Sequence, residues 1–367
     1  MRARDYGIQI GDGEPGPLNA ITDVAGVAVG HVTLIEGSAP LPAGHGPVRT
    51  GVTVIMPARE IWTRPLFAGC HRLNGNGEMT GLEWVRESGL LTSPVAITNT
   101  HSVGVVRDAL IAHRQRKGTA AGGSPWALPV VGETWDGALN DIDGFHVRPE
   151  HVAEAIEQAA DGPVSEGNVG GGTGMICHGF KGGIGTASRR RPAGEGGYTV
   201  GVLVQANHGR RARLAVNGVP VGRLIGPDAV PLAGAMESVP PGSGSIIVVI
   251  GTDAPLLPHQ CTRLAQRAGL GIARTGGVGE HASGDLFLCF ATGNTGMDAG
   301  EGGREGPATL PLTMLSDALI TGLFDAVIEA TEEAIVNALL AAETMRGRDG
   351  NVAHGLDGER LRSVLSS

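Results

Sequence analysis

A run of strand-forming residues begins, without a spacer, at the end of a loop rich in proline and glycine. Residues 240–251 read Pro-Pro-Gly-Ser-Gly-Ser-Ile-Ile-Val-Val-Ile-Gly. A short apolar run bounded by turn residues predicts a strand that is buried on both faces. Glycine at positions 242 and 244 allows a sharply bent backbone and the close approach of a second group. The pattern therefore predicts that the Ser245 hydroxyl lies at the mouth of a central strand.

Two interpretations of Ser245 are open at this point. If the bond between Gly244 and Ser245 were cut, Ser245 would carry a nucleophilic hydroxyl and its own amine as a base. An adjacent base is an established way of activating a weak hydroxyl nucleophile. An ordinary Gly/Ser turn before a core strand explains the same residues and is the preferred interpretation from this stretch alone.

Strand-like and helix-like segments are mixed along the whole chain. Strands are predicted at 27–32, 52–56, 95–98, 128–131, 199–206, 246–250 and 286–291. Helices are predicted near 82–87, 105–114 and 150–158, from Pro258 to a stop at Gly269, and within 314–345. The last helix has an apolar face, with acidic residues expected on the other face: Asp317, Asp325, Glu329, Glu332 and Glu333. Strands apolar on both faces together with amphipathic helices predict an α/β layered sandwich with helices outside.

A stretch rich in proline and glycine at 228–244 is predicted to be an exposed linker. It divides the chain into residues 1–244 and 245–367. The strand predicted at 246–250 is too apolar to lie anywhere but in the interior. We therefore expect one domain over residues 1–367, not two independent ones.

The charge balance argues against nucleic acid as a partner. The chain has 28 basic and 37 acidic residues and a net charge of −9, whereas nucleic-acid binders usually carry a basic patch. The arginines at 189–191 and 210–211 are local exceptions and are interpreted as solvated loops. The sequence contains no apolar run of about 18 residues, the length that a membrane-spanning helix needs, so we expect no membrane span. The N-terminus lacks the apolar segment of a signal peptide.

The cysteines and histidines show no metal-binding pattern in the sequence. The four cysteines, Cys70, Cys177, Cys261 and Cys289, form no Cys-x-x-Cys pair, and the twelve histidines show no His-x-x-x-His spacing. We expect buried thiols in a reducing compartment, a cytoplasmic location, and neither a metal nor a cofactor.

The glycine-rich segment 167–175 resembles the Gly-Gly-Gly-Thr-Gly signature of tubulin-type nucleotide-binding proteins. It departs from that signature at Met175, and no Gly-Lys-Ser/Thr follows, so it is not a P-loop. A nucleotide-binding or assembly protein built around Gly170–Gly174 is one alternative function. A tight structural loop that could line a cleft is the preferred interpretation.

Polar residues at strand ends are candidates for chemistry. Asn207 follows the strand predicted at 199–206, where an amide could donate to a developing oxyanion. Glu133 follows the strand predicted at 128–131, where a carboxylate could hold a ligand ammonium. Ser283 and Asp285 precede the strand predicted at 286–291 and could orient a nucleophile. Taken singly, each is also explained as ordinary turn chemistry or a solvated acid.

Taken together, the segments of this chain resemble a family of self-processing serine hydrolases, the L-aminopeptidase/D-esterase and β-aminopeptidase family. The resemblance extends from about residue 15 to about residue 340, and its motifs agree in order and spacing. The matching segments are 19–31, 129–137, 169–177, 181–188, 202–209 and 244–256.

The resemblance implies a four-layer αββα sandwich that cleaves itself at Gly244–Ser245 into an α chain, 1–244, and a β chain, 245–367. Ser245 would then attack the substrate carbonyl, with its freed amine as general base and Asn207 stabilising the oxyanion. The bond between Gly242 and Ser243 is a second candidate for the cut, but Ser243 is further from the strand.

Other positions acquire roles from the same resemblance. Ser283 and Asp285 match residues that position the nucleophile or its amine, and Glu133 matches the acid that recognises the free N-terminus of the substrate. The implied activity is release of an N-terminal residue from short peptides, amides or esters. The implied assembly is a homo-oligomer, a tetramer of processed αβ pairs.

One position departs from the family pattern. Residue 135 is Trp, where some members have a Tyr whose hydroxyl could assist the oxyanion. Trp135 is therefore interpreted as a pocket wall, and the substrate class stays open. A related alternative is a self-processing acyltransferase similar to ornithine acetyltransferases. Those enzymes use threonine as the nucleophile, so Ser245 argues against it.

Overall fold

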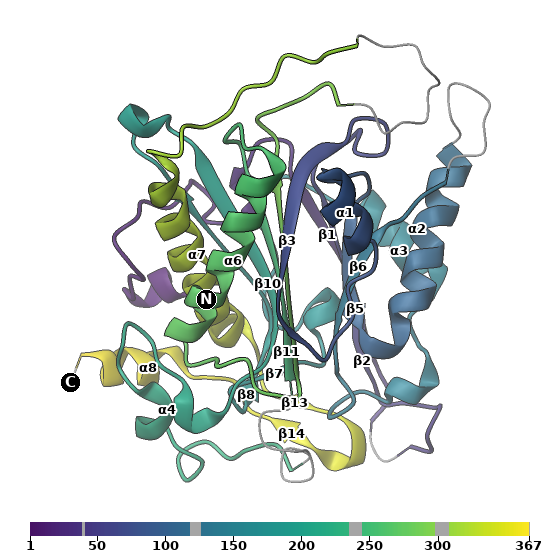
Figure 1. Ribbon diagram of the computed structural model, residues 1–367. Coiled ribbons are helices and arrows are strands. Elements are labelled where there is room, and N and C mark those ends of the chain that lie inside the picture. The colour runs from purple at the N-terminus through teal and green to yellow at the C-terminus, as the bar shows by residue number, and fades with distance from the viewer. Residues whose placement is uncertain (39–40, 118–125, 235–243, 298–307, 367) are drawn as a thin grey trace.

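The structure is a computed structural model that describes residues 1–38, 41–117, 126–234, 244–297 and 308–366. Residues 235–243 of the predicted linker, Ser243 among them, lie outside the described residues. The chain forms a mixed α/β fold, as predicted, with two large sheets and helices packed against both (Figure 1).

The larger sheet has six strands. Their spatial order is β4 (Leu90–Leu91), β3 (Leu66–Gly75), β12 (Ser283–Ala291), β11 (Gly244–Thr252), β10 (Thr199–Asn207) and β9 (Gly183–Arg190). Within this sheet β11 and β12 are parallel, and the other neighbouring pairs are antiparallel. The strand that begins with Gly244 and Ser245 therefore lies inside the sheet, between two long neighbours.

The smaller sheet has four strands. Their order is β1 (Ala28–Glu36), β2 (Val48–Met56), β5 (Val95–Asn99) and β6 (Val130–Thr134). Two short hairpins complete the described strands: β7 (Ile176–Cys177) with β8 (Phe180–Lys181), and β13 (Met345–Arg346) with β14 (Val352–Ala353). Strand β6 contacts β11 of the larger sheet.

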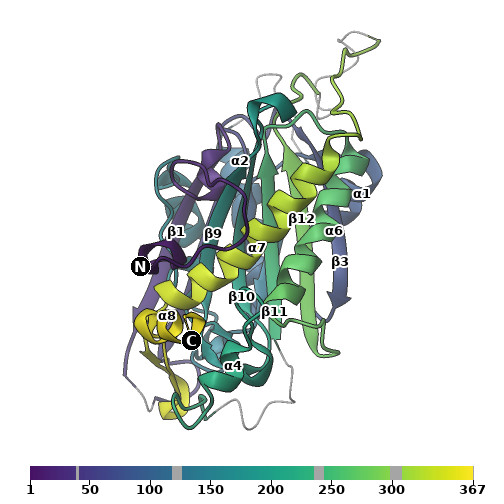
Figure 2. The same ribbon diagram turned by 90° about the vertical axis from the view of Figure 1, so that its left-hand side faces the viewer.

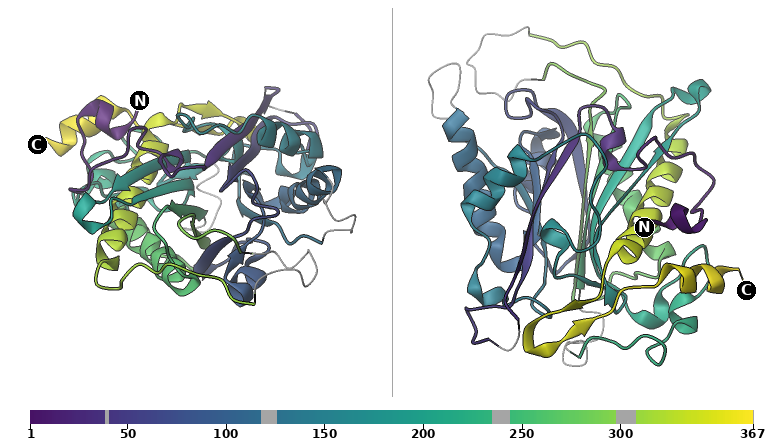
Figure 3. Two further views of the ribbon diagram at one scale, coloured as in Figure 1. Left: turned by 90° about the horizontal axis from the view of Figure 1, so that it is seen from above. Right: turned by 180° about the vertical axis from the view of Figure 1, so that it is seen from behind.

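Two pairs of helices cover the sheets. Helices α6 (Pro258–Arg274) and α7 (Ile320–Ala341) pack on each other and on the larger sheet, as Figure 2 shows. Helices α2 (Val103–Lys117) and α3 (Pro149–Glu157) pack on the smaller sheet, at the side of the molecule opposite to α6 and α7 in both views of Figure 3. The remaining described helices are α1 (Leu82–Ser88), α4 (Val221–Leu224) and α8 (Gly358–Leu365). None of the helices within the described residues is long and apolar enough to span a membrane.

Strand β11 is buried on both faces, which confirms the prediction from its apolar run. Ile246, Val248 and Ile250 pack in the core shared with α6 and α7. Ile247 and Val249 face the opposite way, into the core shared with the smaller sheet. Because successive side chains of a strand point to opposite faces, the Ser245 side chain shares the face of Ile247, towards the smaller sheet.

All seven predicted strands are present, but β3 and β9 were not predicted. The predicted stop of the fourth helix at Gly269 is wrong, since α6 continues to Arg274. Burial of Ile272 in the core outweighs the cost of a glycine in the helix, roughly 1 kcal/mol. The helix ends where Gly276 adopts a positive φ of 92°.

In two arginine segments interpreted as solvated loops, one arginine of each is buried. Arg189 lies in β9 with no exposed surface, and its guanidinium pairs with Glu329 at 3.0 Å and Glu333 at 2.7 Å. Arg211 is also buried, with its guanidinium 3.4 Å from the centroid of the Phe180 ring. Buried charges persist where they are paired and hydrogen-bonded.

The same ion pairs correct the prediction for the acidic face of α7. Glu332 and Glu333 are fully buried, not solvent-facing. Glu333 pairs with Arg189, and Glu332 pairs with Arg274 of α6 at 2.5 Å. The helix therefore buries acids as well as apolar residues, because basic side chains of its neighbours meet them.

Candidate active site

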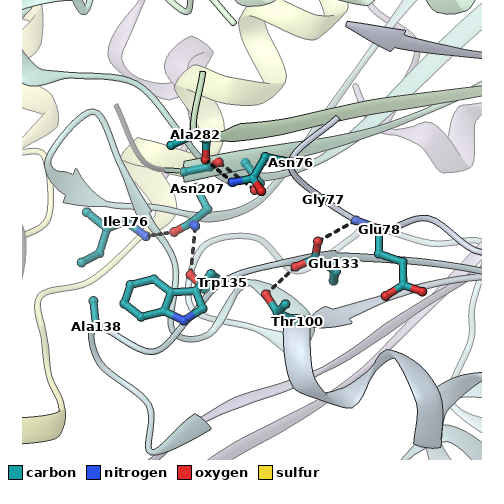
Figure 4. A pocket seen from close by; sticks show the side chains of 12 residues that line it. Asn76, Gly77, Glu78, Thr100, Glu133, Trp135, Ala138, Ile176, Asn207 and Ala282 are labelled. Atoms are coloured by element: carbon teal, nitrogen blue, oxygen red, sulfur yellow. Dashed lines mark hydrogen bonds between the residues drawn. The ribbon is translucent and has the colours of Figure 1, made fainter. Parts of the chain in front are cut away.

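A cavity of about 540 Å³ opens where β6 and β10 end and β11 begins. Figure 4 shows it with Glu133 on one side and the Asn207 amide and Trp135 on the other. Its lining is made of Asn76, Gly77, Glu78, Thr100, Glu133, Trp135, Ala138, Ile176, Asn207, Gly244, Ser245 and Ala282. Four of the residues singled out from the sequence, Glu133, Asn207, Ser245 and Trp135, thus share one cavity.

Ser245 and Asn207 are directly opposite each other on neighbouring antiparallel strands. Their side chains therefore lie on the same face of the sheet. The Ser245 hydroxyl donates a hydrogen bond to the carbonyl oxygen of Gly244 at 2.7 Å, and it accepts one from the Gly284 N–H at 3.3 Å. The hydroxyl is thus held beside the carbonyl of the peptide bond that precedes its own residue.

Glycine at 244 is required by the neighbouring strand. A Cβ atom there would lie 2.4 Å from the carbonyl oxygen of Asn207 and 2.9 Å from the Cα of His208. Both obstacles are backbone atoms, so no side-chain movement would make room. This close contact confirms the interpretation of Gly244 as a site of close backbone approach.

The Asn207 amide has a fixed orientation. Its Oδ1 accepts a hydrogen bond from the Ile176 N–H at 2.8 Å, and its Nδ2 donates to the carbonyl of Trp135 at 2.9 Å. An amide nitrogen carries two protons, and the Trp135 carbonyl takes one of them. The second can serve a ligand in the cavity.

The loop that supplies the Ile176 N–H is anchored by a buried lysine. The Lys181 ammonium donates to the carbonyls of Gly172, Met175 and Gly182 at 3.3, 2.9 and 2.8 Å. Burial lowers the pKa of Lys181 to about 7. Gly170–Gly172 form a buried 3-10 turn that is absent from the described lining of the cavity, so this segment acts as a structural loop.

Glu133 presents a buried carboxylate at the end of β6. One oxygen accepts a hydrogen bond from the Glu78 N–H at 2.8 Å, and the other accepts from the Thr100 hydroxyl. Burial raises the pKa of Glu133, and the two hydrogen bonds oppose that shift. A cationic ligand group in the cavity would restore the charge balance around this acid.

Ser283 and Asp285 lie beside Ser245 but face the other way. Gly284 of β12 is the register partner of Ser245, so its two neighbours project from the opposite face of the sheet. The Ser283 hydroxyl donates to Asp285 at 2.7 Å, and both residues border a small hollow next to His208. Burial raises the pKa of Asp285 to about 6.

Several cavity residues were not found from the sequence. Asn76, Gly77 and Glu78 come from the turn after β3, and Thr100 follows β5. The Asn76 amide donates to the carbonyl of Ala282 at 2.9 Å. The available signal was the turn cluster Asn-Gly-Asn-Gly at 74–77, which follows a strand that was itself missed.

Comparison with known proteins decides the family. The profile of peptidase family S58 matches residues 19–353. The chain belongs to peptidase family S58. This membership, together with aminopeptidases as relatives, makes the protein a hydrolase of the aminopeptidase class.

The relatives of this S58 peptidase span almost its whole length. It is 50% identical to the beta-peptidyl aminopeptidase of Sphingosinicella microcystinivorans, over 99% of this chain and 91% of the relative. A solved beta-aminopeptidase from Burkholderia sp. is 55% identical, with a TM-score of 0.90 over 100% of this chain and 98% of that one.

A second solved structure adds a description of the fold. The L-aminopeptidase D-ala-esterase/amidase of Ochrobactrum anthropi is 44% identical, with a TM-score of 0.89 over 100% of this chain and 98% of that one. It is described as a prototype for the serine aminopeptidases and a new variant of the Ntn hydrolase fold.

Trp135 is 39% exposed in this S58 peptidase and lines the cavity beside Ala138 and Ile176 (Figure 4). Its backbone carbonyl, not its indole, contacts the Asn207 amide. The side chain is therefore free to shape the space that a ligand would occupy.

Proposed function

We propose that this S58 peptidase releases the N-terminal residue from short peptides, amides or esters, with Ser245 as the nucleophile. The observation that carries the proposal is the shared cavity: the Ser245 hydroxyl, the Asn207 amide and the buried Glu133 carboxylate all border it. Aminoacyl nitroanilides, assayed beside their N-acetylated counterparts, test it. Equal rates with and without the free amine would remove the aminopeptidase assignment.

We further propose a single four-layer αββα domain over residues 1–367. Support comes from the two helix pairs, each packed on a different sheet, and from the contact between β6 and β11. After self-cleavage this domain would consist of an α chain, 1–244, and a β chain, 245–367. A tetramer of such pairs, which light scattering would detect, and a cytoplasmic location stay predictions.

The first chemical event in this proposal is cleavage of the chain itself. The Ser245 Oγ attacks the carbonyl carbon of Gly244, the C–N bond breaks, and the hydroxyl proton passes to the departing nitrogen. The resulting ester is then hydrolysed by water, which leaves a carboxylate on Gly244 and restores the hydroxyl. The hydrogen bond of 2.7 Å from the Ser245 hydroxyl to the Gly244 carbonyl oxygen supports the first step, because it holds the nucleophile beside the group that it would attack.

Peptide hydrolysis follows the same chemistry with an external carbonyl. The new α-amine of Ser245 takes the Oγ proton, as an amine with an ordinary pKa of about 7.7–8.0 can do near neutral pH. The second proton of the Asn207 Nδ2 stabilises the oxyanion. The proton then passes to the departing amine, and water hydrolyses the acyl-serine ester.

Ser283 and Asp285 act in this proposal as positioning residues. Their mutual hydrogen bond fixes the start of β12, where the Gly284 N–H donates to the Ser245 Oγ. Because they face away from Ser245, they would hold the nucleophile through this backbone contact.

A change in the pH dependence of stability follows from Asp285. Its pKa of about 6 in the folded protein lies above the usual 3.8. Burial of the charged carboxylate therefore lowers the free energy of unfolding at a pH above both pKa values, and this loss disappears at a pH below both. Asp285→Asn is therefore expected to melt at a higher temperature than the wild type at about pH 8. The difference should shrink as the pH falls from about 6 to about 4. Thermal unfolding across this range measures it.

Asp108→Asn is the matched control, since Asp108 is exposed on α2. It should show no such pH-dependent difference. A shift in melting temperature for Asp285→Asn that is equal at both ends of the range would contradict the assignment.

Glu133 binds the substrate ammonium in this proposal. Glu133→Gln removes the charge and turns one amide N–H towards a donor, either the Glu78 N–H or the Thr100 hydroxyl. Losing a charge-assisted hydrogen bond costs about 2 kcal/mol, so kcat/KM should fall roughly 30-fold, mostly through KM. Steady-state kinetics on an aminoacyl nitroanilide measure the loss.

Glu78→Gln removes a charge from the same cavity without touching the Glu133 carboxylate. It should lower kcat/KM by less than about threefold, as exposed charges contribute little. Equal losses in both variants would show that general cavity charge, and not Glu133, holds the amine.

β-Aminoacyl compounds are proposed to lie within the substrate range. The support is the 50% and 55% identity to proteins named beta-peptidyl aminopeptidase and beta-aminopeptidase. A panel of β-alanyl, L-alanyl and D-alanyl nitroanilides tests this range. Hydrolysis of the L-alanyl compound alone would contradict it.

A further inference from the structure

A cluster of one thiol and two imidazoles lies directly behind the cavity. One donor atom from each of Cys177, His178 and His208 falls within 4.8 Å of the others, and all three residues are buried. Cys177 and His178 belong to the β7–β8 hairpin, and His208 follows β10. The backbone N–H of His178 donates a hydrogen bond to the backbone carbonyl of His208 at 2.7 Å, which holds the two segments together.

The hydrogen bonds of His178 leave a lone pair for a ligand. Its Nδ1 lies 3.1 Å from the carbonyl oxygen of Arg210, and a carbonyl only accepts, so Nδ1 carries the proton. Metal-binding histidines characteristically donate their other ring N–H to such a carbonyl. The Nε2 atom of His178 is buried without a hydrogen-bond partner among the described residues. A bound cation would satisfy a nitrogen that the protein leaves unpaired.

The charges around the cluster favour a monovalent ion. Two basic side chains lie close to the cluster. The Arg211 Nε donates to the His178 carbonyl at 3.1 Å, and Lys181 of the adjoining strand β8 is buried, with its ammonium bonded to three backbone carbonyls. One thiolate and two neutral imidazoles cancel the charge of a monovalent cation but leave a divalent one uncompensated. Thiolate and imidazole ligands are those that copper(I) accepts.

We propose that Cys177, His178 and His208 form a three-coordinate site for copper(I). The Cys177 Sγ gives up its proton to solvent on binding, and the metal enters without a change of oxidation state. The Cys177 Sγ and the His208 Nδ1 are already 3.8 Å apart, so binding requires only small movements of these two side chains and of the backbone that carries them.

The site is coupled through the backbone to the cavity. Ile176 precedes Cys177, Asn207 precedes His208, and the Ile176 N–H donates to the Asn207 Oδ1 at 2.8 Å. A metal that draws Cys177 and His208 together therefore shifts both partners of the bond that orients the Asn207 amide. Occupancy of the site lowers hydrolysis; this consequence rests on the proposed role of Asn207, whereas the binding does not.

Anaerobic titration of the full chain with copper(I), against a chromophoric copper(I) chelator, tests the binding. The wild type should take up one tight equivalent. Cys177→Ser and His178→Asn should bind at least about 100-fold more weakly, since losing even an outer partner costs 10–100-fold. His178 has a φ of 49° before Gly179, and Asn tolerates this conformation, so His178→Asn keeps the hairpin.

Cys70→Ser is the control, because Cys70 is a buried thiol of β3 away from the cluster. It should bind copper(I) like the wild type. Absence of a tight equivalent in the wild type, unchanged binding by His178→Asn, or tighter binding of zinc(II) than of copper(I) would each overturn the site. Full hydrolytic activity of the loaded wild type would overturn its coupling to Asn207.

Discussion

Ser245→Ala is expected to remain a single polypeptide and to hydrolyse no aminoacyl nitroanilide above background. The variant lacks the Oγ that lies 2.7 Å from the Gly244 carbonyl oxygen in the wild type, so neither the self-cleavage nor the acyl transfer has a nucleophile. Removing a nucleophile in a serine hydrolase costs on the order of 10⁶ in kcat. Denaturing electrophoresis, N-terminal sequencing of the smaller band and a rate assay measure the two losses.

Ser243→Ala is the control, because it removes the other serine that follows a glycine in this stretch. It should be processed and active like the wild type, with the smaller chain beginning at Ser245. A wild-type protein that is active while fully intact would contradict the proposed mechanism. A smaller chain that begins at Ser243 would show that Ser243, and not Ser245, is the nucleophile.

Apolar periodicity predicted the parts of the fold whose burial depends on apolar residues. Strand β11 is the clearest case, with alternate isoleucines and valines in two cores. Strand β9 was missed because it reads Gly-Ile-Gly-Thr-Ala-Ser-Arg-Arg and its buried Arg189 is neutralised by acids of a helix about 140 residues further along the chain. A pattern search within a short window cannot detect a partner at that distance.

The residues of the candidate site likewise divide into those that the sequence could indicate and those that it could not. Glu133 and Asn207 could be selected from the sequence because each ends a predicted strand, and strand ends meet at sheet edges. Thr100 could not, because its contact with Glu133 depends on which strands are neighbours. The face of the sheet on which the Ser283 and Asp285 side chains lie relative to Ser245 depends on the register of β11 against β12. A slip of one residue would place them on the same face as Ser245.

Asn207→Ala is expected to lower kcat about 10²- to 10³-fold while KM changes little. The amide donates to the oxyanion only as charge develops, and losing one such donor costs about 3 kcal/mol of barrier. Steady-state kinetics of the processed protein measure the effect. Because the Asn207 amide also bridges Ile176 and Trp135, thermal unfolding must accompany the rates.

Asn207→Asp separates the donor from the bond to Ile176, although it also loses the hydrogen bond to the Trp135 carbonyl. An aspartate keeps the shape and the Oδ1 acceptor for the Ile176 N–H but has no proton for an oxyanion, so its kcat should fall at least as far as that of Asn207→Ala. If the aspartate variant kept most of the wild-type kcat, the bridge to Ile176 alone would account for the residue. If KM rose in both variants while kcat stayed the same, Asn207 would contribute to binding of the substrate and not to stabilisation of the transition state. The oxyanion would then need another hydrogen-bond donor at the cavity.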